Sequence, residues 1–152
     1  RVARAAVNMC GAKKKMLDPF CGSGGILIEA GLMGLKPVGF DIDDIMLRRA
    51  EINLKHYGVD HELYKQDALS FEEVYDHIVT DPPYGKYTGE KDLEGLYQRF
   101  LDHLSSKLGE RAVLIHPGLD LDFSEFNVLK KFSYRIHKSM KRHIIILEPP
   151  KG

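Results

Sequence analysis

The sequence predicts an α/β domain with a seven-stranded, mostly parallel sheet and helices on both of its faces. Short apolar runs alternate along the chain with amphipathic segments of helical spacing, which is the pattern of parallel strands joined by helices. The last two apolar runs, 126–136 and 143–147, follow each other closely. They should therefore pair as a C-terminal hairpin, which adds one antiparallel strand to the sheet.

The strands are placed by the apolar runs and by the turn residues that bound them. In chain order, the expected strands occupy 16–20, 38–41, 62–65, 77–80, 112–115, 126–136 and 143–147. The hairpin is expected to turn around Ser139 and Met140.

The helices are placed by apolar residues that recur at helical spacing. They are expected over 1–9, 25–35, 43–58, around 71–74, and over 93–108. The last has the clearest pattern, because leucine and aromatic residues mark one face from Leu93 to Leu108. Asp43 or Asp44 can cap the helix that begins there, and Gly58 can end it.

Composition limits the class of protein. With 152 residues the chain is one domain that is large enough to bury a core. The formal net charge is +0, so nucleic-acid binding would depend on a local patch or on another module. Cys10 and Cys21 have no metal-ligand spacing, which fits a reducing, cytoplasmic location and predicts no metal. The longest apolar runs are too short to span a bilayer, which predicts no membrane partner.

Acidic residues stand at three successive strand ends, where ligands bind in such a sheet. Asp18 precedes the glycine-rich Cys21-Gly22-Ser23-Gly24-Gly25, and it could hold a positively charged amino group close to that turn. Asp41, about 20 residues further on, is placed to bond the hydroxyls of a ribose. Asp67 could accept from an adenine amine, although as a lone residue it would be a turn residue. Together they describe a pocket for S-adenosylmethionine.

The fourth strand ends at Asp81-Pro82-Pro83-Tyr84, which could hold an amine-bearing base. The prolines lack backbone donors and leave nearby carbonyl groups rigidly aimed. The Asp81 carboxylate and the Pro82 carbonyl could each accept one amine hydrogen, while Tyr84 stacks on the base. A simple proline turn is the structural alternative.

These motifs resemble the class I S-adenosylmethionine-dependent methyltransferases, with a Rossmann-like fold, over the whole chain. The sequences DPFCGSGGILIEAG, from Asp18, and DPPYG, from Asp81, are more specifically similar to the catalytic domain of the tRNA guanine-N(2)-methyltransferases that carry a THUMP RNA-binding domain. The resemblance implies tRNA as partner. It also implies that residues 1–152 are a methyltransferase domain from a longer protein whose N-terminal RNA-binding domain is absent.

The resemblance also implies roles for individual residues. Asp18, Gly22 and Gly24 would contact the methionine part of the cofactor, Asp41 the ribose, and Asp67 and Ala68 the adenine, with Phe20 and Ile42 in the same site. The catalytic group would be Asp81, Pro82, Pro83 and Tyr84.

The acid in this motif favours guanine as the target base. Guanine has a ring N–H donor beside its amine, so a carboxylate can accept from both, whereas adenine and cytosine present an acceptor there. Methylation of an rRNA guanine or of a DNA adenine remains an alternative.

A basic rim next to Asp81 is expected from the hairpin turn. Lys138 and Arg142 in that turn, with Lys86 after Tyr84, are candidates for phosphate contacts. A solvated turn is the alternative for all three residues.

Two other classes of protein are alternatives. A dehydrogenase domain would use the glycine turn and Asp41 but would leave Asp81 without a role, and a non-catalytic module would need neither. Cys21 is interpreted as a packing residue and His116 as part of a structural turn.

Overall fold

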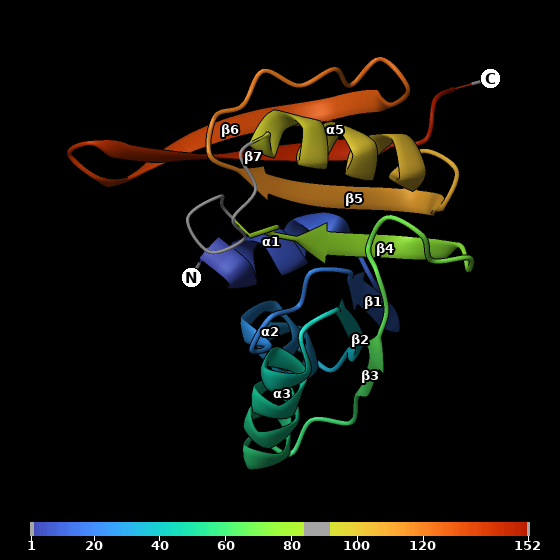
Figure 1. Cartoon of the computed structure of the whole chain (residues 1–152), viewed down its shortest axis with the longest axis vertical. Helices are drawn as coiled ribbons and strands as arrows, with labels where there is room; N and C mark the ends of the chain where they lie inside the picture. The colour runs from blue at the N-terminus through green and yellow to red at the C-terminus, as the bar shows by residue number, and fades with distance from the viewer. Residues whose placement is uncertain (1, 84–91, 152) are drawn as a thin grey trace.

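The computed structural model describes residues 2–83 and 92–151 as one sheet with helices packed against it (Figure 1). The helices are α1 (Val2–Cys10), α2 (Gly25–Leu32), α3 (Asp44–His56) and α5 (Leu93–Leu104). The strands are β1 (Lys15–Asp18), β2 (Lys36–Asp41), β3 (Glu62–Lys65), β4 (Tyr75–Thr80), β5 (Leu108–His116), β6 (Asn127–His137) and β7 (Met140–Glu148).

The seven strands are arranged in the order β3-β2-β1-β4-β5-β7-β6. All neighbouring pairs from β3 to β5 are parallel, and β7 is antiparallel to both β5 and β6. The predicted mostly parallel sheet with one antiparallel strand in a C-terminal hairpin is therefore confirmed. Figure 1 shows this hairpin extending well beyond the ends of the other strands.

Each face of the sheet has its own apolar core. Buried residues of α1, α2 and α3, such as Val7, Leu27 and Leu54, pack on one face. On the other face, Phe100 and its neighbours on α5 pack together with a group of aromatic side chains. Helices thus cover both faces, as predicted.

One predicted element is wrong. The segment 71–74 is not helical, and the ring of Phe71 is buried against other aromatic side chains. It lies 5.5 Å from Phe40 and 4.7 Å from His103, measured between ring centroids. The segment runs as irregular chain, and Phe71 joins the apolar core on the α5 face of the sheet.

The remaining differences concern where elements end. The helix predicted over 93–108 ends at Leu104, because Leu108 already pairs with Tyr75 at the start of β5. Within 2–83 and 92–151, no helix is long and apolar enough to cross a membrane.

Candidate active site

The carboxyl ends of β1, β2 and β4 meet at one edge of the sheet. Asp18 is the last residue of β1, Asp41 is the last residue of β2, and Asp81 directly follows β4. Strand order reverses between β1 and β4, and such a reversal opens a crevice in which ligands bind. The sheet topology therefore brings the three predicted acids to one binding edge.

Asp18 is a buried carboxyl group, with 2% of its surface exposed. Its Oδ1 accepts hydrogen bonds from the Thr80 hydroxyl at 2.6 Å and from the Phe20 backbone N–H at 3.0 Å. Burial, together with the negative charges of Asp81 and Asp41, raises the pKa of Asp18 to about 7 against the opposing effect of these two bonds. A cation placed beside Asp18 would reverse this effect, since it stabilises the carboxylate.

The glycine-rich turn is attached to β2 through Asp41. The Gly22 N–H donates to Asp41 Oδ2 at 2.9 Å, and the Asp43 N–H donates to Asp41 Oδ1 at 2.9 Å. Gly22 and Gly24 have φ values of +53° and +98°, a region that favours glycine. The carboxylate expected to hold a ribose thus also fixes the turn beside it.

Cys21 lies inside this turn and packs in the core. Its backbone N–H donates to the Phe40 carbonyl at 2.9 Å. Burial raises the pKa of its thiol, which keeps the sulfur neutral and unreactive. The interpretation of Cys21 as a packing residue is confirmed.

The other predicted cofactor residues lie along the same edge. Ala68 is buried, and the Asp67 carboxylate accepts from the Leu69 N–H at 2.8 Å. Ile42 is 67% exposed, and Phe20 packs edge-on against Phe100 at 5.1 Å. Asp43 is the cap of α3, accepting from the Ile45 N–H at 2.8 Å.

Tyr97 is a site residue that the sequence analysis missed. It is fully buried on α5, and its hydroxyl donates to the Pro82 carbonyl at 3.0 Å. A buried tyrosine usually finds a hydrogen-bond partner for its hydroxyl. The signal in the sequence was therefore a tyrosine on the apolar face of the predicted helix. Of the predicted catalytic group, Tyr84 lies outside the described residues, as does Lys86 of the predicted substrate contacts.

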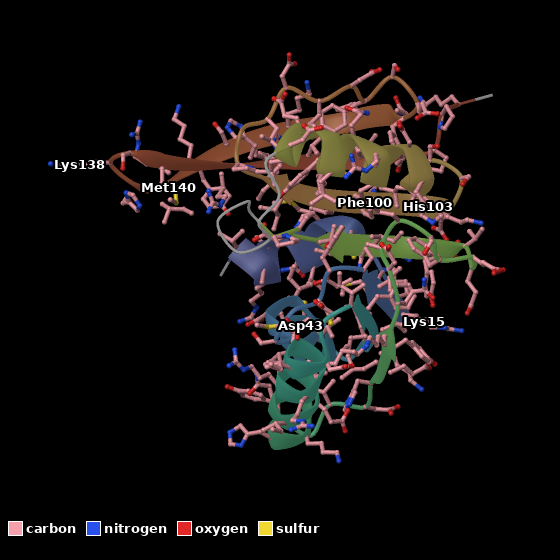
Figure 2. All side chains as sticks on the ribbon, viewed as in Figure 1. Lys15, Asp43, Phe100, His103, Lys138 and Met140 are labelled. Carbon is pink, nitrogen blue, oxygen red and sulfur yellow. The ribbon has the colours of Figure 1, made fainter. Side chains whose placement is uncertain are left out.

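The remaining candidate substrate residues, Arg142 and Lys138, are in different places. Arg142 lines a cavity of about 460 Å³ together with Asp81. Lys138 lies at the outer end of the hairpin (Figure 2). The basic rim expected from the sequence is therefore divided into an inner part and an outer part.

His116 forms the structural turn expected of it. Its Nδ1 accepts from the N–H groups of Gly118 and Leu119, both at 3.2 Å, which leaves the hydrogen of the neutral ring on Nε2. Burial, with the nearby His143 and Lys131, lowers the pKa of His116 to about 4, so the ring stays neutral.

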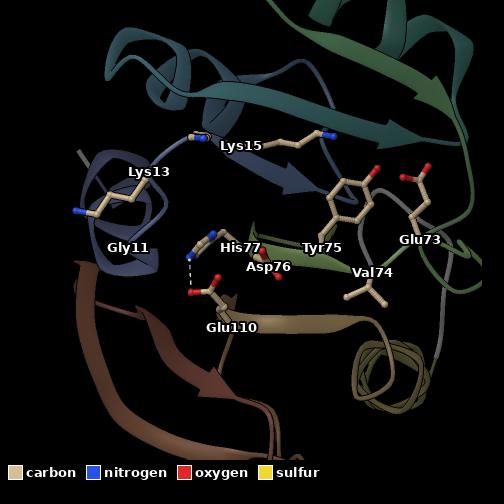
Figure 3. A pocket seen from close by; sticks show the side chains of 10 residues that line it. Gly11, Lys13, Lys15, Glu73, Val74, Tyr75, Asp76, His77 and Glu110 are labelled. Atoms are coloured by element: carbon tan, nitrogen blue, oxygen red, sulfur yellow. Dashed lines mark ion pairs between the residues drawn. The ribbon is translucent and has the colours of Figure 1, made fainter.

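A second hollow, of about 540 Å³, lies at the opposite edge of the sheet (Figure 3). It is lined by Lys15 and Tyr75, which begin β1 and β4, and by the ion pair of His77 and Glu110 at 3.7 Å. None of the predicted site residues lines it. In the described part of the chain, no group of three or more histidine, cysteine or acidic side chains could hold a metal ion.

The fold and this edge of acids are typical of a methyltransferase domain of the Rossmann-like class. The solved structure of magnesium protoporphyrin IX methyltransferase from Synechocystis PCC 6803, with S-adenosylmethionine bound, superposes with a TM-score of 0.74. The match covers 98% of this chain and 75% of that one at 16% sequence identity, so it shows a common fold.

The family model UPF0020, an RMKL-like methyltransferase domain, matches residues 1–144, and the chain belongs to this family. The predicted resemblance is confirmed by relatives. The tRNA (guanine(10)-N2)-dimethyltransferase of Methanothermobacter thermautotrophicus is 44% identical over 97% of this chain and 48% of its own length. The protein of the same name from Pyrococcus abyssi is 43% identical, over 97% of this chain and 49% of its own length. The chain thus spans about half the length of these two relatives.

Proposed function

We propose that this chain is the catalytic domain of an enzyme that transfers a methyl group from S-adenosylmethionine to the exocyclic 2-amino group of a guanine in tRNA. The observation that carries the proposal is the placement of Asp81 and the Pro82 carbonyl at the same sheet edge as Asp18 and Asp41. The names of the two archaeal relatives support the substrate.

The residues present fit the cofactor. Asp18 is a buried carboxyl group whose pKa is raised to about 7 without a cation beside it, and a bound amino group would supply that cation. Gly22 and Gly24 keep side chains away from the turn, so that its backbone can approach a ligand closely. Asp41, with Ile42, would bind the ribose, and Asp67, with Ala68, the adenine. The cofactor supplies an electrophilic methyl group on a sulfonium.

The protein's contribution to the reaction is to hold the amine. The nitrogen of an exocyclic amine is a poor nucleophile because its lone pair is delocalised into the ring. If one hydrogen is bonded to the Asp81 carboxylate and the other to the Pro82 carbonyl, the lone pair is directed at the methyl carbon. Positioning of this kind can supply about 7–11 kcal/mol of the barrier in favourable cases.

The proposed transfer is a nucleophilic substitution at the methyl carbon. In such a transfer the nitrogen–carbon bond would form as the carbon–sulfur bond of the cofactor breaks, and the amine proton would pass to the Asp81 carboxylate. Because Asp81 is exposed, that proton can leave to water.

Binding of the whole tRNA rests on further surfaces. We include in the proposal an RNA-binding domain N-terminal to this one, the hairpin lysine Lys138 as a phosphate contact, and action in the cytoplasm. Stacking by Tyr84 and a phosphate contact by Lys86 rest on the sequence alone.

The test is methylation of bulk tRNA by the full-length protein with labelled S-adenosylmethionine, followed by nucleoside analysis. Labelled N(2)-methylguanosine, or its dimethylated form, is expected. Label in a different nucleoside would overturn the base assignment. Unlabelled tRNA, with label in parallel reactions on rRNA or DNA, would support the alternative substrates.

A further inference from the structure

The cavity that contains Asp81 has a second polar wall, which is made by β6 and β7. Tyr134 and Arg142 are direct cross-strand partners in this hairpin. Residues that pair in this way project from the same face of the sheet. Both line the cavity of about 460 Å³ with Asp81, Ile26, Ile115 and Ile136.

Strand alternation fixes which face this is. Ile144 and Ile146 follow Arg142 at intervals of two residues and are buried in the core under α1 and α2. Side chains two residues apart lie on one face of a strand. Arg142 therefore lies on the same face of β7 as Ile144 and Ile146, at the outer end of that row of side chains. Ile115 of β5 lies on this face too.

The charges of Asp81 and Arg142 both act on the hydroxyl of Tyr134. Burial raises the pKa of the Tyr134 hydroxyl, and the Asp81 carboxylate raises it further, whereas the Arg142 guanidinium opposes the shift. Tyr134 thus lies within the field of both charged groups. The Asp81 carboxylate, a hydrogen-bond acceptor, and the Arg142 guanidinium, a hydrogen-bond donor, line the same cavity.

We propose that Arg142 selects guanine in this cavity by donating hydrogen bonds to the O6 and N7 acceptors of the base, while Asp81 accepts from the N1–H and amine side. This inference rests on the proposed function, and it reassigns Arg142 from a phosphate contact to a base contact. Arg142 is a specificity-determining residue, and Tyr134 supplies an aromatic wall beside the base.

The chemistry of the base supports this division. Guanine presents O6 and N7 as adjacent acceptors, and the two-pronged guanidinium is the side chain that most often binds them. Adenine has an amine in place of O6, which would face the guanidinium with a donor. The volume is also within the range of about 300–1,000 Å³ that small-ligand pockets occupy.

Lys138 provides a matched comparison. It is a cation of the same hairpin, but it lies at the outer end, away from the cavity (Figure 2). If Arg142 only contacted phosphate, replacing either residue would have the same kind of effect.

The experiment uses the full-length protein and tRNA assembled with either guanine or 7-deazaguanine at the methylated position. The analogue lacks only the N7 acceptor and keeps the amine, N1–H and O6. We expect the wild-type kcat/KM to fall about 10-fold on the analogue, since a hydrogen bond to a charged group is lost. Arg142→Met should be slower on guanine and should show no further loss on the analogue. Lys138→Met should keep the wild-type ratio between the two substrates.

The outcomes separate this inference from the proposed function. A wild-type enzyme that forms no N(2)-methylguanosine overturns both. A wild-type enzyme that methylates both tRNAs equally, or an Arg142→Met variant that keeps the wild-type ratio, overturns the role of Arg142 alone. If Arg142→Met is too slow to assay, the affinity of the two tRNAs for wild type and variant is compared by fluorescence anisotropy. The variant must then lose the preference for guanine.

Discussion

The hydroxyl of Tyr97 donates to the carbonyl oxygen of Pro82 over 3.0 Å, from a side chain with none of its surface exposed. A carbonyl oxygen has two lone pairs, and this bond occupies one of them. In the proposed mechanism, the other accepts a hydrogen from the target amine. Tyr97 is thus a positioning residue that fixes the Pro82 carbonyl. It does so from the face of the sheet that lies opposite the glycine turn.

Replacement of Tyr97 with Phe tests that role, because it removes one oxygen atom and keeps the buried ring. We expect kcat to fall about 10-fold, equivalent to the ~1.4 kcal/mol that one aligned hydrogen bond can supply. KM for tRNA should stay unchanged, because the phenol is fully buried. The kinetic constants are measured beside the free energy of unfolding in urea. A purely structural role would lower stability and leave kcat per folded enzyme as in the wild type.

Replacement of Asp81 with Asn should stop methyl transfer without emptying the cofactor site. The amide cannot take the proton, and its NH₂ group would meet the N1–H of guanine donor to donor. We expect kcat to fall by at least about 100-fold, with S-adenosylhomocysteine affinity within about threefold of wild type in calorimetry. Asp102→Asn, at an exposed position of α5, is the control and should behave as the wild type. Full activity in Asp81→Asn would contradict the mechanism.

Asp18 should make both stability and cofactor affinity depend on pH. Its pKa is raised from 3.8 to about 7 in the folded protein, so the folded state binds more protons than the unfolded state between these values. The resulting stabilisation is complete below about pH 4 and is lost as the pH rises through 7. Asp18→Asn does not titrate but keeps an oxygen that can accept from Thr80.

We therefore expect the free energy of unfolding in urea, measured without cofactor, to become progressively larger for Asp18→Asn than for the wild type from pH 5 to pH 8. In the wild type, S-adenosylhomocysteine should bind more tightly at pH 8 than at pH 6, because its amino group favours the carboxylate. Parallel pH curves for the two proteins would show that Asp18 does not titrate in this range.

The glycine turn supplies a pair of substitutions that separates backbone strain from helix formation. Gly24 has a φ of +98°, and a Cβ there would lie 3.4 Å from the Ala50 Cβ. Gly24→Ala should lower the free energy of unfolding by about 1–2 kcal/mol. Gly25 begins α2 without a positive φ, and a Cβ there meets nothing within 4 Å. Gly25→Ala should stabilise the protein by about 0.4–1 kcal/mol. Equal effects in urea titrations would contradict this account.

The sequence was sufficient to predict the sheet and its acidic edge. Apolar runs mark buried parallel strands, and the acids that follow them must then gather at one edge, as Asp18 and Asp41 do. Local pattern failed at 71–74, where the ring of Phe71 packs against residues that are distant in sequence. Tyr97 and Tyr134 were missed for a similar reason. Helical spacing places Tyr97 on an apolar face but does not show which carbonyl its hydroxyl meets.

In the hairpin formed by β6 and β7, the register that places Arg142 and the length of the outer tip can change independently. Arg142 faces Asp81 because of its register, and an insertion of a single residue between Tyr134 and Arg142 would turn one of them to the other face of the sheet. Lengthening both strands by two residues beyond the Arg135–Lys141 pair preserves that register and moves only the outer tip. Changes at the tip would therefore alter the proposed phosphate contact of Lys138, while the proposed base contact of Arg142 keeps its register.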